Sequence, residues 1–366
     1  MTQVLCIVGA RPNFMKIAPI MTAFHNSGIA AKLVHTGQHY DEAMNDRFFA
    51  DLGIRAPDYH LEVGSGSHAH QTAEVMKRFE PVVLQENPAA VLVVGDVNST
   101  IACALVASKL NVPVIHVEAG LRSYDRGMPE EINRVLTDQI SSLLFTTERS
   151  ALENLKREGV DEAAVHFVGN VMIDSLFRNL AQSVPAEQTL GRNIDQYALL
   201  TLHRPSNVDH KATLASLLEA VDEINRKLPV VFPMHPRTRG KIEQFGLHDL
   251  LKNLHVLPPA GYLEILGLMK SARLVMTDSG GIQEETTALG VPCLTLRENT
   301  ERPITLHEGT NTLIGLDTNA LKKAVTEIMT TGGKAGRVPE YWDGHAADRI
   351  AAVMKSWLPA NMKEVA

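Results

Sequence analysis

Short, unbroken apolar runs alternate along this chain with longer segments of helical periodicity. The runs read VLCIVG, AKLVHTG, AVLVVGD, VPVIHVEAG, LLFTT and VHFVGN, and then YALLTLH, VVFPMH, LHVLPP, ARLVMTDSGG and VPCLTL. Unbroken runs rich in Val, Ile and Leu are typical of strands that are buried on both faces. Strands separated by helices predict parallel sheets with crossover helices, so the predicted fold class is α/β.

The number of runs predicts two domains. The chain has 366 residues, and eleven strands at this spacing are too many for one sheet. We expect a first domain over residues 1–170 and a second over residues 171–345, with a connecting helix in GNVMIDSLFRNLAQ. The order strand, polar turn, helix, strand in residues 90–120 recurs in residues 272–302, which indicates two similar doubly wound domains. Such sheets bind ligands at the carboxyl ends of their strands.

Composition and charge exclude several classes of protein. The net charge is −7 and no long Lys/Arg block is present, so we expect no nucleic-acid partner. Cys6, Cys103 and Cys293 each lie in an apolar run, as expected for reduced core residues. The start MTQVLCIVGARP is unlike a signal peptide, and no run reaches the ~18 apolar residues of a membrane span. We therefore expect a cytoplasmic protein with no membrane partner.

Polar side chains gather where the predicted strands end. The positions are Arg11 and Lys16, Asp96, His116 and Glu118, His203 and Arg204, His235 and Arg237, and Ser279 with Gly280 and Gly281. Because strand ends are solvated, one polar residue at a strand end does not by itself predict a ligand-binding site. Six strands that end in this way predict ligand-binding edges on the sheets.

The stretch TDSGGIQEE suits an anionic ligand. Gly280 and Gly281 lack a Cβ, and the N-terminus of the following helix presents unpaired N–H groups with a partial positive charge. Charge-assisted hydrogen bonds are available from Arg11, Arg204 and Arg237. Neither GxxxxGK[ST] nor GxGxxG is present, so neither an ATP P-loop nor an NAD fingerprint is predicted. An ordinary turn with Ser279 as helix N-cap remains an alternative.

Two glutamates follow this turn. Glu285 lies about one helical turn beyond the predicted diphosphate, so we interpret it as the acceptor for ribose hydroxyls. For Glu284 the simpler interpretation is an acid that stabilises the helix N-terminus.

Further acidic residues follow two strands of the first domain. Asp96 and Glu118 end consecutive strands, which are usually neighbours, so we expect both carboxylates to face one crevice. Glu130 and Glu131 come soon afterwards in MPEEINRVLTDQI, where we expect Glu131 to be an exposed helix residue. Clustered carboxylates can divide into acid and base roles.

The histidines differ in their setting. His203 ends a strand, where an imidazole suits proton transfer or a phosphate contact. His68 and His70 lie in a polar Gly/Ser loop without a cluster of other ligands, so no metal site is predicted there.

The ordered set of motifs resembles one family. From about Val4 to Gly344, this chain resembles the non-hydrolysing UDP-N-acetylglucosamine 2-epimerases. The motifs that carry the resemblance are GARPNFMK, TGQHYD, GDVNST, HVEAGLRS, MPEEINRVLTD, GNVMID, TLHRPSNVD, HPRTR, GYLEILGLM, TDSGGIQEE and ENTERP. The resemblance implies a GT-B fold, in which two Rossmann-like doubly wound domains flank an interdomain cleft. It also implies a C-terminal helix, within residues 346–366, that packs on the first domain.

The resemblance implies an activity as well. Members interconvert UDP-GlcNAc and UDP-ManNAc with no redox cofactor and no metal, usually as homodimers, and supply ManNAc for bacterial surface polysaccharides. By position, Lys16 and Arg11 match residues that serve the diphosphate and the catalytic cleft. The matching catalytic carboxylates are Asp96, Glu118 and Glu130, and His203 matches the histidine beside the diphosphate. The predicted UDP-binding set is Arg11, Arg204, His235, Arg237, Ser279, Gly280, Gly281 and Glu285.

Several departures leave the substrate open. Many members have Glu where this chain has Asn13, and HRREN or HRAEN where it has HRPSN. In the enzymes that a second UDP-GlcNAc regulates, Arg and Gln residues follow QH. In this chain the segment QHYDEAMN lacks them after QH. GARP, TGQHYD and HPRTR also resemble the branch that acts on UDP-2,3-diacetamido-glucuronate. A GT-B glycosyltransferase is a further alternative, although it would not need three clustered acids.

Overall fold

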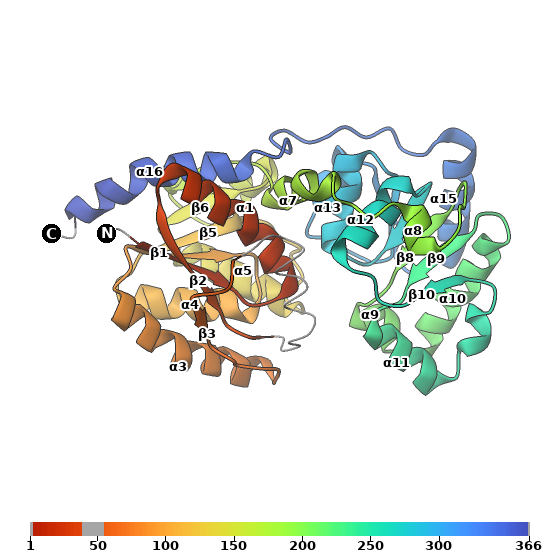
Figure 1. Cartoon of the computed structure of the whole chain (residues 1–366), viewed down its shortest axis with the longest axis horizontal. Coiled ribbons are helices and arrows are strands. Elements are labelled where there is room, and N and C mark those ends of the chain that lie inside the picture. Colours follow the sequence, from red (N-terminus) through yellow and green to blue (C-terminus); the bar gives the residue numbers. More distant parts are fainter. Residues whose placement is uncertain (1–2, 39–54, 365–366) are drawn as a thin grey trace. The chain divides into compact units, whose positions relative to one another are not determined.

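The computed structural model describes residues 3–38 and 55–364, and its contacts divide the chain into two units (Figure 1). The first unit holds the chain up to Arg178 and again from Glu340, and the second holds Asn179–Pro339. The changeover falls near the end of helix α7 (Val171–Leu180), so most of this helix belongs to the first unit.

The described part of the first unit is built on a parallel sheet in the order β3-β2-β1-β4-β5-β6-β7. The strands are β1 (Gln3–Val8), β2 (Ala30–His35), β3 (Tyr59–His60), β4 (Ala90–Val94), β5 (Val114–Ala119), β6 (Leu143–Thr146) and β7 (Val165–Phe167). β4, β5 and β6 are buried along their whole length, as their unbroken apolar runs predict. The order reverses between β1 and β4, which is the switch point where doubly wound sheets bind ligands.

Helices connect these strands and cover the sheet. They are α1 (Arg11–Ser27), α3 (His68–Glu86), α4 (Asn98–Lys109), α5 (Pro129–Gln139), α6 (Arg149–Arg157), the short 3-10 helix η1 (Glu162–Ala164) and α7. Gly28 ends α1 with a φ of 73°, a conformation that glycine adopts without strain.

The second unit repeats this winding. Its described strands form a parallel sheet in the order β10-β9-β8-β11-β12-β13. They are β8 (Ala198–Thr201), β9 (Val230–Pro233), β10 (His255–Leu257), β11 (Leu274–Thr277), β12 (Cys293–Thr295) and β13 (Asn311–Leu313). The helices are α8 (Ala186–Leu190), α9 (Pro205–Val208), α10 (Lys211–Asn225), α11 (Pro236–Phe245), η2 (His248–Leu251), α12 (Tyr262–Ser271), α13 (Gly280–Leu289), α14 (Pro303–His307) and α15 (Thr318–Thr331).

The last helix, α16 (Ala346–Glu364), returns to the first unit and packs on α1 (Figure 1). Asp174 of α7 accepts hydrogen bonds from the backbone N–H groups of Ala346 and Ala347, at 3.1 and 2.7 Å, and so caps the start of α16. The indole Nε1 of Trp342 donates to the carbonyl oxygen of Thr147 at 3.1 Å. Side-chain hydrogen bonds therefore fasten the returning segment to α7 and to the loop after β6.

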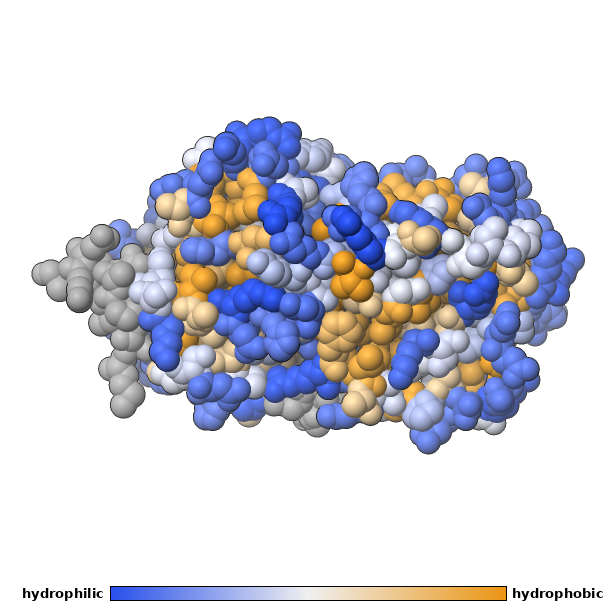
Figure 2. Space-filling view, turned by 90° about the horizontal axis from the view of Figure 1, so that it is seen from above, coloured by the Kyte–Doolittle hydropathy of each residue, from blue (hydrophilic) through white to orange (hydrophobic). Residues whose placement is uncertain are grey.

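The surface is mixed in character. Figure 2 shows hydrophilic and hydrophobic side chains interspersed over the face that it presents. Within residues 3–38 and 55–364, no helix combines the length and the apolar character needed to cross a bilayer. Cys6, Cys103 and Cys293 are all buried free thiols, as predicted.

Candidate active site

Glu118 lies near the carboxyl end of β5 and forms a buried ion pair with Lys16 of α1. The two residues are 4% and 5% exposed. The backbone of Glu118 has a φ of 74°, which is rare for a residue with a Cβ, and the register of β5 with β6 shifts at this point. A Cβ on Gly95 would lie 3.0 Å from Lys16 Nζ, so glycine leaves the room that this lysine needs.

Asp96 follows β4, the strand next to β5, and is held by Arg134 of α5. Arg134 Nη2 lies 2.5 Å from Asp96 Oδ2, and Asn133 Nδ2 donates to the backbone carbonyl of Asp96 at 2.9 Å. The Asp96 side chain remains 22% exposed. Asp96 thus follows β4, and Glu118 lies near the carboxyl end of the adjacent strand β5.

The prediction for Glu131 is wrong. This residue is 3% exposed, and its carboxylate accepts hydrogen bonds from the backbone N–H groups of Ser123 and Tyr124 at 2.9 and 2.8 Å. Arg134 adds an ion pair at 2.6 Å. The cause is tertiary, because the loop 120–128 folds back over the first turn of α5. Its neighbour Glu130 is half-buried on the same turn.

A buried polar network lies next to these carboxylates. The ring of His116 lies 2.6 Å from Asp138 Oδ1 through Nδ1 and 2.8 Å from the carbonyl oxygen of Gly95 through Nε2. Asp138 Oδ2 accepts from the backbone N–H of Gly120 at 3.0 Å and pairs with Arg122 at 2.7 Å. Burial lowers the pKa of the Arg122 guanidinium, but ion pairs with Glu158 and Asp138 outweigh it and raise the pKa overall.

In the second unit, the N-terminus of α13 begins at Gly280, with Ser279 at the N-cap position. The Ser279 side chain makes no capping hydrogen bond, so the simple N-cap alternative lacks its defining contact. A Cβ on Gly280 would lie 2.7 Å from Glu301 Oε1. The backbone of this turn therefore closely approaches an anionic group.

Arginines surround the carboxylate of Glu301 at this turn. Arg297 Nη2 lies 2.7 Å from Glu301 Oε2, and Arg204 Nη2 lies 3.9 Å from Glu301 Oε1. Burial alone would raise the pKa of Glu301, but the charges of Arg302, Arg297 and Arg204 hold it well below its usual range. The region already accommodates one buried negative charge, and it has the donors to bind an anion.

His203 is oriented by Asp278, a fully buried residue that directly follows β11. His203 Nδ1 lies 2.9 Å from Asp278 Oδ1, and the backbone N–H groups of His203 and Arg204 also donate to this carboxylate. Burial raises the pKa of Asp278, but hydrogen bonds from His203 and the backbone lower it overall. The imidazole is 38% exposed, so it is held in place and still reachable.

His235 and Arg237 lie at the start of α11, after β9. The His235 ring lies 5.6 Å from that of His203, and its Nδ1 accepts the backbone N–H of Arg237 as a helix cap. Arg237 is half-exposed and pairs with Asp209 at 2.5 Å.

Glu285 of α13 is buried and accepts a hydrogen bond from the Tyr262 hydroxyl at 2.9 Å. Burial raises the pKa of Glu285 to about 7; the Tyr262 hydrogen bond opposes this shift, and the charge of Glu284 adds to it. Glu284 is itself buried and pairs with Arg302 at 2.8 Å, which is a tighter role than dipole stabilisation.

The predicted site residues are divided between the two units. In the first unit Lys16 follows β1, Asp96 follows β4, Glu118 lies near the end of β5 and Glu130 lies on α5. Arg11 begins α1, although its side chain is outside the described structure. In the second unit His203, Arg204, His235, Arg237, Ser279, Gly280, Gly281 and Glu285 follow β8, β9 and β11. The segment QHYDEAMN runs beyond the described residues after Gln38.

Sequence reasoning missed Asn133, Arg134, Asp138, Asp278 and Tyr262. Arg134 and Asp138 stand three and seven residues after Glu131, a helical spacing that places all three on one face of α5. This signal was readable from the sequence, but a charged stripe is ordinarily taken for a solvated face.

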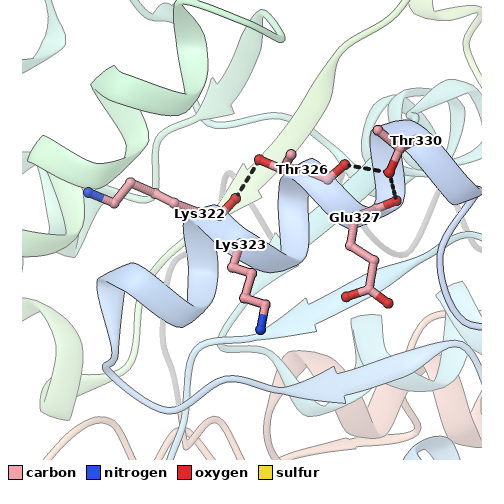
Figure 3. A pocket seen from close by; sticks show the side chains of 5 residues that line it. All are labelled: Lys322, Lys323, Thr326, Glu327 and Thr330. Atoms are coloured by element: carbon pink, nitrogen blue, oxygen red, sulfur yellow. Dashed lines mark hydrogen bonds between the residues drawn. The ribbon is translucent and has the colours of Figure 1, made fainter.

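A search for metal-binding groups and one surface hollow bear on the remaining residues. No group of three His, Cys, Asp or Glu suited to a metal is found in residues 3–38 and 55–364, and the His68 ring bonds to Asn98. Figure 3 shows a surface hollow along α15, lined by Lys322, Lys323, Thr326, Glu327 and Thr330. Its lining comes from one helix and includes no predicted site residue.

Comparison with known proteins identifies close relatives. The profile of a family described as UDP-N-acetylglucosamine 2-epimerase matches residues 22–355. The chain is 44% identical over 358 residues to the UDP-N-acetylglucosamine 2-epimerase of Methanocaldococcus jannaschii, covering 95% of this chain and 97% of that relative. It is also 44% identical over 355 residues to the UDP-2,3-diacetamido-2,3-dideoxy-D-glucuronate 2-epimerase of Pseudomonas aeruginosa, covering 95% and 98%.

A solved structure is similar over the same length. The crystal structure of the M. jannaschii UDP-GlcNAc 2-epimerase in complex with UDP-GlcNAc and UDP has a TM-score of 0.90 and 43% identity, covering 97% of this chain and 100% of that one. These similarities confirm the predicted fold class, an α/β protein of GT-B type with two Rossmann-like doubly wound sheets.

Proposed function

The chain belongs to the UDP-N-acetylglucosamine 2-epimerase family, and from this membership and the two groups of residues we propose that it inverts C2 of a UDP-2-acetamido sugar. The observation that carries the proposal is the pair of carboxylates Asp96 and Glu118, which lie at the carboxyl ends of adjacent strands, each beside a cation. Epimerisation at a carbon that bears hydrogen needs proton-handling groups, and carboxylates can provide them.

The proposed route is elimination and re-addition. The C2 proton is not acidic enough for simple removal, so a carboxylate takes it while the C1–O bond breaks and its electron pair leaves with UDP. The products of this step are a glycal and UDP. UDP then adds back to C1 while C2 receives a proton on the opposite face, which gives the epimer. The proton carriers that we propose are Asp96, Glu118 and Glu130.

Lys16 and Arg134 support these roles. Lys16 pairs with Glu118 and Arg134 pairs with Asp96, so each carboxylate has a neighbour that stabilises its ionised form. Ionised carboxylates are the forms that can accept a proton.

The second group of residues would bind the nucleotide. We assign the diphosphate to the N-terminus of α13 at Ser279, Gly280 and Gly281, with cations from Arg11, Arg204 and Arg237. His203, held by Asp278, would lie beside the departing phosphate with His235 next to it. Glu285 would accept the ribose hydroxyls. A bound UDP that cannot escape is required for re-addition.

We propose two candidate substrates, which differ in their sugar substituents at C3 and C6. UDP-GlcNAc, converted to UDP-ManNAc, is the first, as in the name of the M. jannaschii relative. UDP-2,3-diacetamido-glucuronate is the second, because the P. aeruginosa relative named for that sugar is equally identical to this chain.

The proposal includes the setting of the enzyme. Elimination needs no hydride acceptor, so we propose that neither NAD nor a metal ion takes part. We further propose a cytoplasmic enzyme of polysaccharide biosynthesis that acts as a homodimer. Ile132 and Leu136 support a self-interface, because they expose about half of their side chains on one face of α5. Light scattering of the purified protein tests the oligomeric state.

A nuclear magnetic resonance time course in D₂O tests the reaction. UDP-GlcNAc and UDP-2,3-diacetamido-glucuronate are each incubated with the enzyme, without an acceptor and with EDTA. We expect the C2 epimer of one sugar to appear with deuterium at C2. An epimer without deuterium at C2 would contradict elimination, and transfer that requires an acceptor would indicate a glycosyltransferase.

Asp96→Asn tests the residue assignment. This change keeps size and removes basicity, so turnover should fall on the order of 10²–10⁴-fold while UDP still binds. Asp161→Asn is the matched control, because Asp161 caps η1 on the surface of the same unit. Normal turnover of Asp96→Asn would place the proton carrier elsewhere.

A further inference from the structure

His116 forms a hydrogen-bonded bridge between the ends of two neighbouring strands. Its Nε2 lies 2.8 Å from the carbonyl oxygen of Gly95, the residue before Asp96. Its Nδ1 lies 2.6 Å from Asp138, whose other oxygen accepts the backbone N–H of Gly120, two residues after Glu118. The bridge therefore joins the backbone beside both proposed proton carriers.

The partners of His116 fix the orientation of its ring. The Gly95 carbonyl is an acceptor, so Nε2 donates to it. Nδ1 and Asp138 Oδ1 share a hydrogen bond, while Asp138 Oδ2 accepts from Arg122 and Gly120. The ring is fully buried, and so is Asp138.

Arg122 joins this buried pair to Glu158, a partly exposed residue at the edge of the network. Arg122 Nε donates to Glu158 at 2.8 Å and its Nη2 pairs with Asp138 at 2.7 Å. Paired charges are tolerated in an interior, whereas removal of one partner leaves another uncompensated. The network is thus a connected unit rather than a lone buried histidine.

The backbone that this network holds is unusual. Glu118 has a φ of 74°, and Gly120 follows with a φ of 78°. A Cβ on Gly120 would lie 2.6 Å from the carbonyl oxygen of Ala151, so the chain is also pressed against α6 here. A strained conformation persists only where surrounding contacts fix it, and the hydrogen bond from Gly120 to Asp138 is such a contact.

We propose that His116 and Asp138 are positioning residues that fix Asp96 and Glu118 relative to each other, on opposite faces of the reacting sugar carbon. The inference rests on the proposed function. Neither residue touches substrate; His116 acts through Gly95 on Asp96, and Asp138 acts through Gly120 on Glu118. Misplacement by about 1 Å can cost on the order of 10²-fold in rate, so this bridge would govern turnover and not nucleotide binding.

Two amide variants test the two hydrogen bonds of His116 separately. The side-chain nitrogen of Asn corresponds to Nδ1 of histidine, and that of Gln corresponds to Nε2. His116→Asn therefore keeps the donor to Asp138 and loses the bond to Gly95, whereas His116→Gln keeps the bond to Gly95. His166→Asn is the matched control, because His166 is a partly buried histidine of β7 outside the bridge.

The readouts are kcat and KM for UDP-GlcNAc, UDP affinity by calorimetry, and free UDP released per epimer formed. Stability is measured by urea unfolding. We expect kcat of His116→Asn to fall on the order of 10²-fold, with UDP affinity and KM unchanged. Free UDP per epimer should rise, because a misplaced carboxylate delays protonation of the glycal and lets UDP escape. His116→Gln should lose less turnover, and His166→Asn should behave as wild type.

These measurements distinguish a failure of this inference from a failure of the proposed function. A folded His116→Asn enzyme with normal kcat and no extra free UDP would overturn the inference and leave the proposed function intact. Equal losses in all three variants, in proportion to lost stability, would also overturn it, because that pattern indicates a purely structural role. Wild-type enzyme that epimerises neither UDP-sugar would overturn the proposed function itself.

Discussion

Lys16→Met should destabilise the first unit by an amount that depends on pH. The change keeps the aliphatic length of the side chain and removes the charge that pairs with the buried Glu118 carboxylate. Breaking a buried pair costs roughly 3–5 kcal/mol while the remaining group stays charged. Protonation of Glu118 limits this cost, because neutralising a carboxyl of ordinary pKa ~4.3 at pH 7 costs about 4 kcal/mol, at 1.36 kcal/mol per pH unit. At pH 5 the same limit is only about 1 kcal/mol.

The sign of the pH dependence follows from linkage. Without the Lys16 charge the pKa of the buried Glu118 would rise, so the folded variant would bind more protons than the folded wild type and would gain stability relative to it as pH falls. The loss relative to wild type should therefore be small at pH 5 and large at pH 7.

Tryptophan fluorescence can follow this loss in the first unit alone. Both tryptophans, Trp342 and Trp357, belong to the first unit, so urea unfolding at pH 5, 6 and 7 reports on that unit. In the double variant with Glu118→Gln, the pH-dependent part of the loss should disappear. A loss of equal size at every pH, or none at pH 7, would refute the reasoning.

Other predictions concern the second unit and the thiols. Gly267→Ala should destabilise the second unit by about 1–3 kcal/mol or more, measured by thermal unfolding with circular dichroism. The reason is that the new Cβ would lie 1.7 Å from the carbonyl oxygen of Val184. Because Gly→Ala in a helix otherwise stabilises, a rise in stability would contradict this packing. UDP affinity should fall as pH drops through about 7, where Glu285 takes a proton, in calorimetry from pH 6 to 8. UDP lacking both ribose hydroxyls is the control, and an equal pH dependence for it would remove Glu285 from the ribose contact. All three cysteines should resist a thiol reagent in the native protein and react in denaturant, since they are buried and burial raises their pKa.

The strands were predictable where they lie in apolar runs. All eleven predicted runs contain a strand, because a run that is buried on both faces must be apolar throughout. The sequence did not indicate β3 (Tyr59–His60) or β13 (Asn311–Leu313), which are short edge strands with polar residues. The polar residues of β3 and β13 interrupt the apolar signal, whereas the edge strands β7 and β10 lie in apolar runs and were predicted.

The candidate site was predictable at strand ends and less so on helices. Asp96 and His203 follow apolar runs, and that position in a parallel sheet suffices to predict a ligand-facing edge. The buried face of α5 was not predictable in the same way. Glu131, Arg134 and Asp138 are buried because loop amides, Asp96 and His116 satisfy them, and these partners lie on other elements and loops.

Two departures from ordinary rules of burial and backbone conformation lie at the proposed site. Glu118 has a left-handed backbone, and α5 buries its charged face while Ile132 and Leu136 are exposed. Each feature costs free energy that a chain selected only for stability would avoid, since apolar side chains would fill the same space more cheaply. Glu118 is itself a proposed proton carrier, and the charged face of α5 holds Asp96 through Arg134. This concentration of costs around one pair of carboxylates favours catalysis at that point over a purely structural role for the charged residues.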